Sequence, residues 1–303
     1  MKRRIVLIVL FLFFAFGLVS CSDQDRSIND SSGEQNEAPY VTKVSDDEAP
    51  TTSKVEDTDN PNDVVDSNAD PLDMAIRTAI AEQNNGKYLP GECYGVGYKI
   101  VETFTDDDIL SVYALTAYLE YRFEDDVFVS ISGTNPQVLM RFRLAGEDNY
   151  ELMYYERLDI FSGLSDEELE ELLQPLVDTG KDYIYTEQDL QEVRAQADGC
   201  AAEYLKSIGR EADIGTCQEH SGQLLTELAL NEDLLKELFK DEELSLYPNW
   251  TGTTERIEDG VRYIYQTAFD EEKQEIVYTK SEYETKVVKN SIVVDIQTET
   301  IVR

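Results

Sequence analysis

The stretch Ile109-Leu-Ser-Val-Tyr-Ala-Leu-Thr-Ala-Tyr-Leu-Glu-Tyr-Arg-Phe123 is rich in β-branched and aromatic residues and lies between turn clusters at Thr105–Asp108 and Glu124–Asp126. Such a run favours a β-strand, because these side chains pack well on a pleated surface. Similar stretches on either side of it predict further strands: Gly95–Phe104, Val127–Ser132, Gln137–Leu144 and Tyr150–Leu158. The breaks between them are too short for parallel crossovers, so we expect an antiparallel meander.

Helix signals precede and follow this block of strands. Asp70 before Pro71 is typical of a helix start, and apolar residues at four-residue spacing predict a helix over residues 71–84. A second helix is expected over residues 222–240, where leucines recur at helical spacing.

Two capping boxes mark helices in the middle of the chain. Ser165 with Glu168 precedes a leucine-rich segment, and Thr186 with Asp189 begins a segment that we expect to run as a helix to Ser207. In this motif each side chain bonds the other residue's backbone N–H, which satisfies two of the free donors of a first helical turn.

Strand patterns return near the carboxyl end, over Val261–Phe269, Glu275–Thr285 and Ile292–Gln297. Strands, then a central helical block, then strands predict an α+β fold with a mostly antiparallel sheet. The pattern leaves open whether the last strands join the first sheet or form a second one, and so whether residues 71–303 make one domain or two.

The amino terminus predicts a lipoprotein signal peptide over residues 1–20. Three basic residues precede an apolar run, Ile5–Phe16, which is shorter than the roughly 20 residues of a membrane span. The run leads to Leu18-Val19-Ser20-Cys21, which resembles the bacterial lipobox. That resemblance implies cleavage before Cys21 and a diacylglycerol thioether on its sulfur. An uncleaved anchor and a plain secretory signal are the alternatives.

Residues 21–70 are expected to form the lipidated cysteine and a disordered acidic linker. The segment is rich in Asp, Glu, Ser, Asn, Thr and Pro and has few apolar residues. It cannot bury enough apolar surface to offset the entropy lost on ordering. The remaining residues, 71–303, are predicted to form an extracytoplasmic α+β domain at the end of this tether.

The charge of the chain bears on its partners. With 63 acidic and 26 basic residues, the formal net charge is −37. Nucleic-acid binding and adsorption to anionic lipid both need a basic face, so the sequence argues against both. Attachment to the membrane is therefore expected through the lipid anchor alone. A large negative charge most often serves solubility.

Catalytic and cofactor motifs are missing. The one histidine, His220, excludes a H-E-x-x-H zinc helix, and the S-x-x-K, G-x-S-x-G and phosphate-binding glycine motifs are absent. We therefore predict no cofactor, no metal site and no catalytic residue. Adjacent acidic residues carry little information in a chain with so many of them.

Three cysteines remain after Cys21. Outside the cytoplasm, Cys200 and Cys217 are candidates for a disulfide, although Cys93 could equally be a partner and all three could stay unpaired thiols. A zinc site from these three with His220 is a weaker hypothesis, because it rests on a single C-x-x-H spacing.

Aromatic residues recur in the predicted strands, and the chain has 18 tyrosines and one tryptophan. Alternate positions such as Tyr263 and Tyr265 could form a stacking platform, but residues of this kind more commonly cover a half-buried sheet. Trp250, in the segment Tyr247-Pro-Asn-Trp250, is expected to pack onto its own core.

Four stretches resemble a domain family of low-GC Gram-positive bacteria. They are Lys87-Tyr-Leu-Pro-Gly-Glu-Cys93, Val112-Tyr-Ala-Leu-Thr-Ala-Tyr-Leu-Glu-Tyr-Arg-Phe123, Ala202-Glu-Tyr-Leu-Lys-Ser-Ile-Gly-Arg-Glu-Ala212 and Ile257-Glu-Asp-Gly-Val-Arg-Tyr-Ile-Tyr-Gln-Thr267. The family is an extracytoplasmic domain found in lipoproteins and appended to BlaR/MecR-type membrane metallopeptidases. The resemblance implies a sensing or interaction module outside the cytoplasm. The peptidase part is missing, so protease activity is not implied.

Together these features predict a lipid-anchored protein on the extracytoplasmic face of the cell membrane. Its function is expected to be non-enzymatic binding or sensing, with an envelope protein or a small ligand as partner. The alternative is a cell-surface hydrolase that uses paired carboxylates, for example on envelope glycans.

Overall fold

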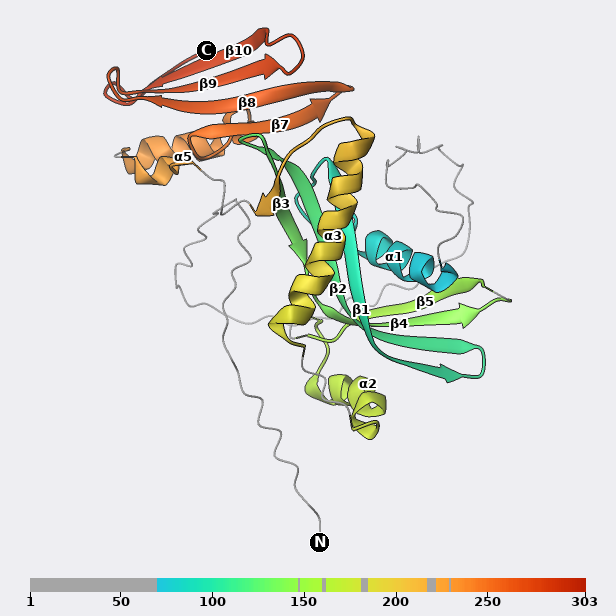
Figure 1. Cartoon of the computed structure of the whole chain (residues 1–303). Helices are drawn as coiled ribbons and strands as arrows, with labels where there is room; N and C mark the ends of the chain where they lie inside the picture. The colour runs from blue at the N-terminus through green and yellow to red at the C-terminus, as the bar shows by residue number, and fades with distance from the viewer. Residues whose placement is uncertain (1–69, 147, 160–161, 181–184, 217–221, 229) are drawn as a thin grey trace, which may run out of the picture.

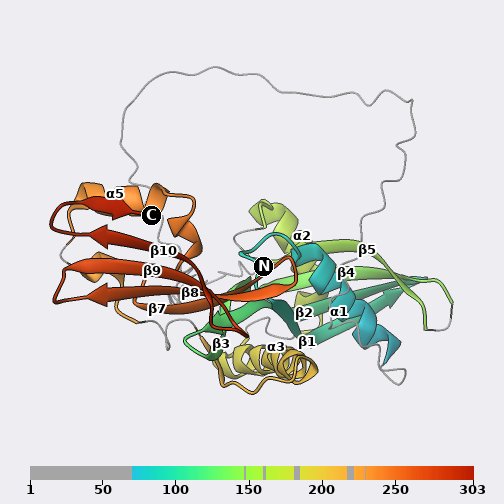
Figure 2. The same ribbon diagram turned by 90° about the horizontal axis from the view of Figure 1, so that it is seen from above.

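A computed structural model describes residues 70–303 except 147, 160–161, 181–184, 217–221 and 229 (Figures 1 and 2). The strands in this part of the chain join one sheet of eleven strands. The predicted signal peptide, Cys21 and the acidic linker lie outside the described residues.

Strand β2 (Ile109–Glu124) organises the first half of the sheet. One of its edges pairs along most of its length with β1 (Cys93–Asp106), and the other edge pairs first with β4 (Gln137–Leu144) and then with β3 (Val127–Thr134). A two-residue turn with positive φ at Asp125 and Asp126 links β2 to β3, as in a type I′ hairpin.

Two further strands complete this half. Strand β5 (Tyr150–Arg157) pairs antiparallel with β4, and the short β6 (Ile214–Thr216) pairs with β3. The β3–β6 pair is parallel, so the expectation of a mostly antiparallel sheet is confirmed with one exception. We call β1–β6 the N-terminal half of the sheet.

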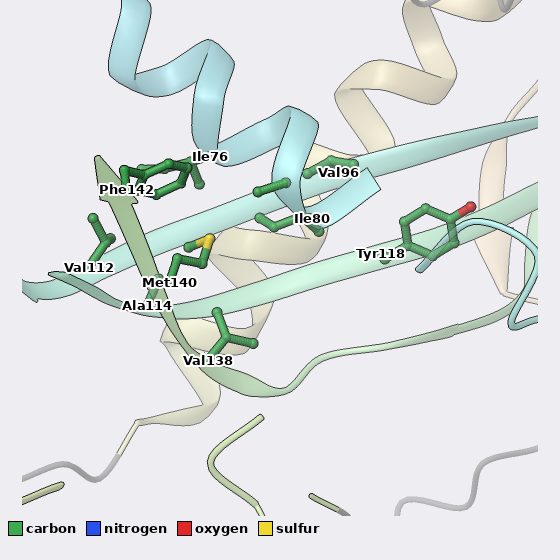
Figure 3. Close-up of a cluster of buried hydrophobic side chains, with 10 residues drawn as sticks. Ile76, Ile80, Val96, Val112, Ala114, Tyr118, Val138, Met140 and Phe142 are labelled. Atoms are coloured by element: carbon green, nitrogen blue, oxygen red, sulfur yellow. The ribbon is translucent and has the colours of Figure 1, made fainter. Parts of the chain in front are cut away.

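Helix α1 (Pro71–Asn84) covers one face of this half. Its residues Ile76 and Ile80 are fully buried against β2 and β4, where Val112 and Met140 form part of the same apolar cluster (Figure 3). The Asp70 side chain accepts a hydrogen bond from the Leu72 N–H, 3.1 Å away, and so caps the helix as the sequence predicts.

Helix α3 (Glu187–Ser207) covers the opposite face of β1 and β2. Val193 and Ala197 pack against Leu115 and Ala117, whose side chains alternate with those that face α1. The contact is close enough to need glycine on β1, since a Cβ at Gly97 would lie 1.9 Å from the Val193 carbonyl oxygen.

Helix α2 (Asp166–Asp178) packs beside β2 and β4. Its Leu176 is buried with Tyr113 and Leu139, and the Tyr113 hydroxyl donates to the Leu172 carbonyl at 2.7 Å. Both predicted capping boxes, at the starts of α2 and α3, are present.

The C-terminal half of the sheet is a meander of five antiparallel strands. They are β7 (Gly252–Glu258), β8 (Val261–Asp270), β9 (Glu275–Glu282), β10 (Val288–Asp295) and β11 (Thr300–Val302). This half joins the first through the pairing of Glu124 with Thr254, so the last strands extend the first sheet.

One face of this meander is covered by short helices. The 3₁₀ helices η1 (Leu225–Glu227) and η2 (Leu244–Leu246) and the helix α5 (Glu232–Lys240) supply leucines to a core that includes Tyr265 and Tyr278. Figures 1 and 2 place α5 on one side of these strands.

The predicted helix over residues 222–240 is wrong in its first part. Leu224 forms a β-bridge with Trp250, η1 follows, and α5 begins only after Asn231. The Asn231 side chain accepts a hydrogen bond from the Asp233 N–H at 2.8 Å. Leucines at helical spacing can pack on a sheet from irregular backbone as well, so a capping residue inside the run was the better guide to the helix start.

Candidate functional site

A shallow groove between α1 and the β4–β5 hairpin is one of the hollows on the described part of the chain, and Phe142 and Leu152 are among the apolar residues that line it. It has a volume of about 320 Å³ and is lined by two segments about 70 residues apart in the chain, Pro71–Glu82 and Phe142–Leu152. That volume lies at the lower end of the range for small-molecule sites, roughly 300–1,000 Å³.

The two walls of the groove come from regular elements, which fixes its shape. Met74, Ala75 and Thr78 lie along one stripe of α1, and Phe142 and Leu152 face them from paired positions of β4 and β5. Phe142 is buried and its ring meets that of Tyr150 edge-on, with centroids 6.3 Å apart.

The rim of the groove carries negative charge. Glu82 lines it on the helix side and Asp148 on the hairpin side, while no basic residue is part of the lining. An apolar floor with an acidic rim matches a ligand that combines an apolar body with a positive charge.

A second hollow lies on the surface of α5. It is lined by Asp233, Lys236, Glu237, Lys240 and Asp241, which are all on or next to one exposed helix. The lysines and carboxylates alternate along that surface, so this hollow has neither an apolar floor nor a single sign of charge.

Buried ions meet where the two halves of the sheet join. Arg262 on β8 donates to Glu92 at 2.6 Å and to Glu255 at 2.8 Å, and Glu255 also accepts from Arg210 at 2.5 Å. We call Glu92, Arg210, Glu255 and Arg262 the junction network. The two carboxylates are 4% and 5% exposed, so their charges are almost fully removed from water.

Aromatic rings enclose the cations of the network. The Arg210 guanidinium lies 3.4 Å from the centroid of Phe123 and 4.7 Å from that of Tyr283. Burial raises the pKa of Glu92, although hydrogen bonds from Arg262 and Tyr204 oppose that effect. Both carboxylates of the network are engaged by arginine, which suits a structural connection better than acid–base chemistry.

A second charged pair lies on β2, on the opposite face of the sheet from Glu255, because its Glu124 pairs with Thr254. Arg122 donates to Glu124 through two nitrogens, at 2.6 and 2.9 Å, and the Glu124 side chain is fully buried. Burial, followed by the nearby charge of Arg122, lowers the pKa of Arg256 on β7. The Thr253 N–H donates to the Asp125 side chain at 2.6 Å, and the Asp125 N–H donates to the Thr253 carbonyl at 3.1 Å. These two bonds connect the end of β2 to β7.

The cysteines that the structure describes are free thiols. Cys93 is buried at the start of β1, and Cys200 lies on α3 with its sulfur 3.6 Å from the Val96 carbonyl oxygen. Burial, with the charges of Glu92 and Glu120, raises the pKa of Cys93, so its thiolate is disfavoured. The predicted pairing of Cys200 with Cys217 lies outside the described residues because Cys217 does.

Metal binding has no candidate in the described part of the chain, where no group of three His, Cys, Asp or Glu side chains could hold an ion. His220, the fourth member of the zinc hypothesis, is not among the described residues. Likewise, no helix in the described ranges is long and apolar enough to cross a membrane.

The aromatic residues of the strands pack in the core, as the sequence predicts. Of the two tyrosines considered as a stacking platform, Tyr265 is 1% exposed and Tyr263 is partly buried against the same core, so both cover the sheet. Tyr113, Tyr118, Tyr121 and Tyr278 are also at most 2% exposed. Trp250 is buried too, as expected.

The groove and the junction network were both missed in the sequence. The groove residues are common types from two distant segments and make no motif. The arginines and glutamates of the network do not stand out in a chain with 63 acidic and 26 basic residues. No local pattern identifies either set, because each is assembled by strand and helix packing.

Comparison of the chain with protein-family models, with curated proteins and with solved structures found no match. The resemblance to the extracytoplasmic domain of BlaR/MecR-type metallopeptidases therefore stays a prediction.

Proposed function

We propose that this protein is a lipid-anchored extracytoplasmic binding module whose ligand occupies the groove between α1 and the β4–β5 hairpin. The observation that carries the proposal is the groove itself, with its apolar floor at Phe142 and its carboxylates Glu82 and Asp148 at the rim. The lipobox-like segment ending at Cys21 and the acidic linker support the location. Because α1 begins at Pro71, directly after that linker, the groove lies at the tethered end of the folded chain.

The chemistry of the groove suggests the class of ligand. A buried phenyl ring and aliphatic walls favour an alkyl or aromatic body of modest size. Two carboxylates and no cation in the lining favour a positively charged head group, such as an amine or a basic peptide side chain.

Binding of octylammonium tests this ligand class. We expect it to bind with a Kd of about 10–1,000 µM, and octanoate, which has the same apolar body and the opposite charge, to bind at least about tenfold more weakly. Isothermal titration of the full chain in detergent micelles, with binding to empty micelles subtracted, measures both. Equal binding of the two probes would contradict a groove selective for cations.

Two variants locate the site. Thr78→Trp places a large ring in the groove from an exposed position of α1 and should abolish binding of octylammonium. Ala195→Trp makes a similar addition at an exposed position of α3, away from the groove, and should leave binding unchanged. If neither variant lost binding, or if both did, the ligand would bind outside the groove.

The anchor has a separate test. Cys21→Ser should abolish labelling of the protein by a radioactive fatty acid and release it from the membrane fraction. Unchanged labelling would overturn the lipoprotein assignment without affecting the groove.

A hydrolase is the second candidate, because Glu82 and Asp148 line the same groove from its two walls. A glycosidase of this kind would need the two carboxyl groups about 5–10 Å apart. We would then expect the full chain to release reducing sugar from peptidoglycan, and Glu82→Gln or Asp148→Asn to slow that release by at least about 100-fold. Absence of release by the unchanged chain would remove this candidate.

A further inference from the structure

The C-terminal half of the sheet has one covered and one open face, and the strand register shows which side chains lie on each. Ile276, Tyr278, Ile292 and Val294 point towards the leucines of α5, η1 and η2 and are at most 2% exposed. Their neighbours along the strands point the other way. We call the surface formed by these neighbours the open face.

The open face has a regular composition. Ala268, Val277, Val293 and Val302 are paired in sequence across four strands and form an apolar row. The next row consists of Gln266, Thr279 and Ser291, which are uncharged and polar. A third row adds Ile264, Ser281 and Val288, the last of them 56% exposed.

None of these side chains belongs to a core cluster of the described residues. Val302 is 60% exposed, and Gln266 and Ser291 are exposed as well, while Thr279 between them is partly buried. Figure 2 shows β7–β10 side by side, with α5 packed on the other side of these strands.

The absence of charge from these three rows is unusual in this protein. The full chain carries a net charge of −37, yet on β8 to β10 the acidic side chains of this face lie in the terminal row, at Asp270, Glu275 and Asp295. On β7, Glu255 extends the third row beside Ile264, where Arg210 and Arg262 of the junction network bind it. An uncharged surface can be desolvated without burying an unpaired ion. Small and β-branched side chains also allow two sheets to pack face to face, about 10 Å apart.

From these observations we propose that the open face is a self-association surface that binds the open face of a second copy of this chain. A flat, uncharged β-surface without large aromatic side chains fits best against another surface of the same kind, and this face is itself one. Two identical patches related by a twofold axis form the commonest kind of homodimer.

The area of the open face determines how tightly two copies are expected to bind. Strands β8, β9 and β10, at about 4.8 Å spacing and with about seven residues each beside this surface, and the three residues of β11 give an area of about 400 Å² per copy. Two such patches bury about 800 Å² in total, less than the roughly 1,200 Å² of standard specific complexes, as in a weak, transient contact. Since the two copies also repel each other through their net charges, we expect a weak dimer with a Kd of about 10–1,000 µM.

Salt should strengthen this dimer. Charges outside the contact repel each other through solvent, and added ions screen that repulsion over distances of about 10 Å at 0.1 M. The apolar contact itself does not depend on such screening. A dimer formed through oppositely charged patches would weaken under the same change.

Sedimentation equilibrium of the full chain in detergent micelles tests the proposal, with Gln266→Arg and Ser291→Arg as disruptive variants. Both positions are exposed, so folding should be unaffected, and a twofold contact would bring the new charges together. Gln191→Arg, an exposed position on α3, is the matched control with the same change of net charge.

We expect the unchanged chain and Gln191→Arg to dimerise alike and more tightly as NaCl rises from about 0.02 M to about 0.2 M. The two disruptive variants should associate at least about tenfold more weakly, although they lower the net negative charge. A chain that stays monomeric at about 1 mM, or a dimer that neither variant weakens, would overturn the proposal. Cross-linking of Ser291→Cys copies in cell membranes by a short bismaleimide, compared with the unchanged chain, gives an independent readout.

Discussion

The two halves of the sheet differ in how many of their faces are covered. Strand β2 lies between α1 on one face and α3 on the other, and its residues Val112–Tyr118 are all buried. Strand β10 has a helix on one face only, and its burial alternates, with Ile292 and Val294 buried and Ser291 exposed.

The amino-acid sequences of the two strands reflect this difference. A strand covered on both sides needs apolar residues at successive positions, whereas a strand covered on one side needs them at every second position. The continuous run of apolar residues in β2 therefore indicates a strand that is covered on both faces. The alternation of apolar and polar residues in β10 indicates a strand that is covered on one face. The β2–β7 pairing, the hydrogen bonds between Asp125 and Thr253 and the junction network connect these two halves.

Removing Arg262 should have the largest effect on this connection. Arg262→Met leaves Glu92 buried without its main ionic partner, which should lower the free energy of unfolding by about 3–5 kcal/mol. We expect urea unfolding to change from one transition to two, with the C-terminal half of the sheet unfolding first. Arg143→Met breaks an exposed pair with Glu151 and should cost about 1 kcal/mol or less. Equal effects of the two changes would show that the network does not connect the halves.

Three valine-to-alanine changes sharpen the comparison of covered and open faces. Val112 and Val294 are fully buried in the two halves, and each change should cost about 1.5–3 kcal/mol. Val277 lies on the open face, and its change should cost less than about 0.5 kcal/mol in the monomer. Urea denaturation at low protein concentration measures all three. A large effect at Val277 would mean that something already covers this face.

The sequence predicts the elements that are determined locally. The start of α1 at Pro71, both capping boxes and the bounds of β4 are confirmed, because a cap or a turn cluster marks each one. Strand β7 was not predicted, since its sequence Gly252-Thr-Thr-Glu-Arg-Ile-Glu258 is mostly polar. Its signal was the turn that follows it: Asp259 and Gly260 both have positive φ, and Asp-Gly is a strong sign of a two-residue hairpin.

The candidate sites depend on contacts that no local pattern encodes. Glu92 and Arg262 are 170 residues apart in the chain. Their proximity depends on where β7 joins β2, which the sequence pattern left undecided. The groove likewise requires α1 to lie beside the β4–β5 hairpin, and the sequence specifies an amphipathic α1 without naming its neighbour.

Removing the helix caps should have smaller effects, and they should be confined to one half at a time. At the start of α3, in the N-terminal half, the Thr186 hydroxyl accepts a hydrogen bond from the Asp189 N–H. In the C-terminal half, Asn231 caps α5. Changing either residue to alanine should cost about 1 kcal/mol. Hydrogen exchange should show faster opening of α3 in the first variant and of α5 in the second. Faster exchange in both halves from either change would show that they unfold as one unit.

The pH dependence of two glutamates should give the smallest effects, of opposite sign. Burial raises the pKa of Glu92, so its contribution to stability is greatest below its ordinary pKa and is lost as the pH rises through the folded-state value. For Glu258 on β7, burial would raise the pKa, but hydrogen bonds from Lys280 and Tyr265 lower it. Its contribution is therefore present above the ordinary pKa and is lost as the pH falls through the lowered value.

Unfolding free energies between about pH 3 and pH 8 separate these two cases. Relative to the unchanged chain, Glu92→Gln should gain stability as the pH rises, because the amide avoids the cost of a buried charge. Glu258→Gln should lose relative stability over the same rise, since the unchanged chain gains its ion pair with Lys280. If the relative stabilities of both variants changed in the same direction with pH, the proposed difference between the buried Glu92 and the half-exposed Glu258 would be contradicted.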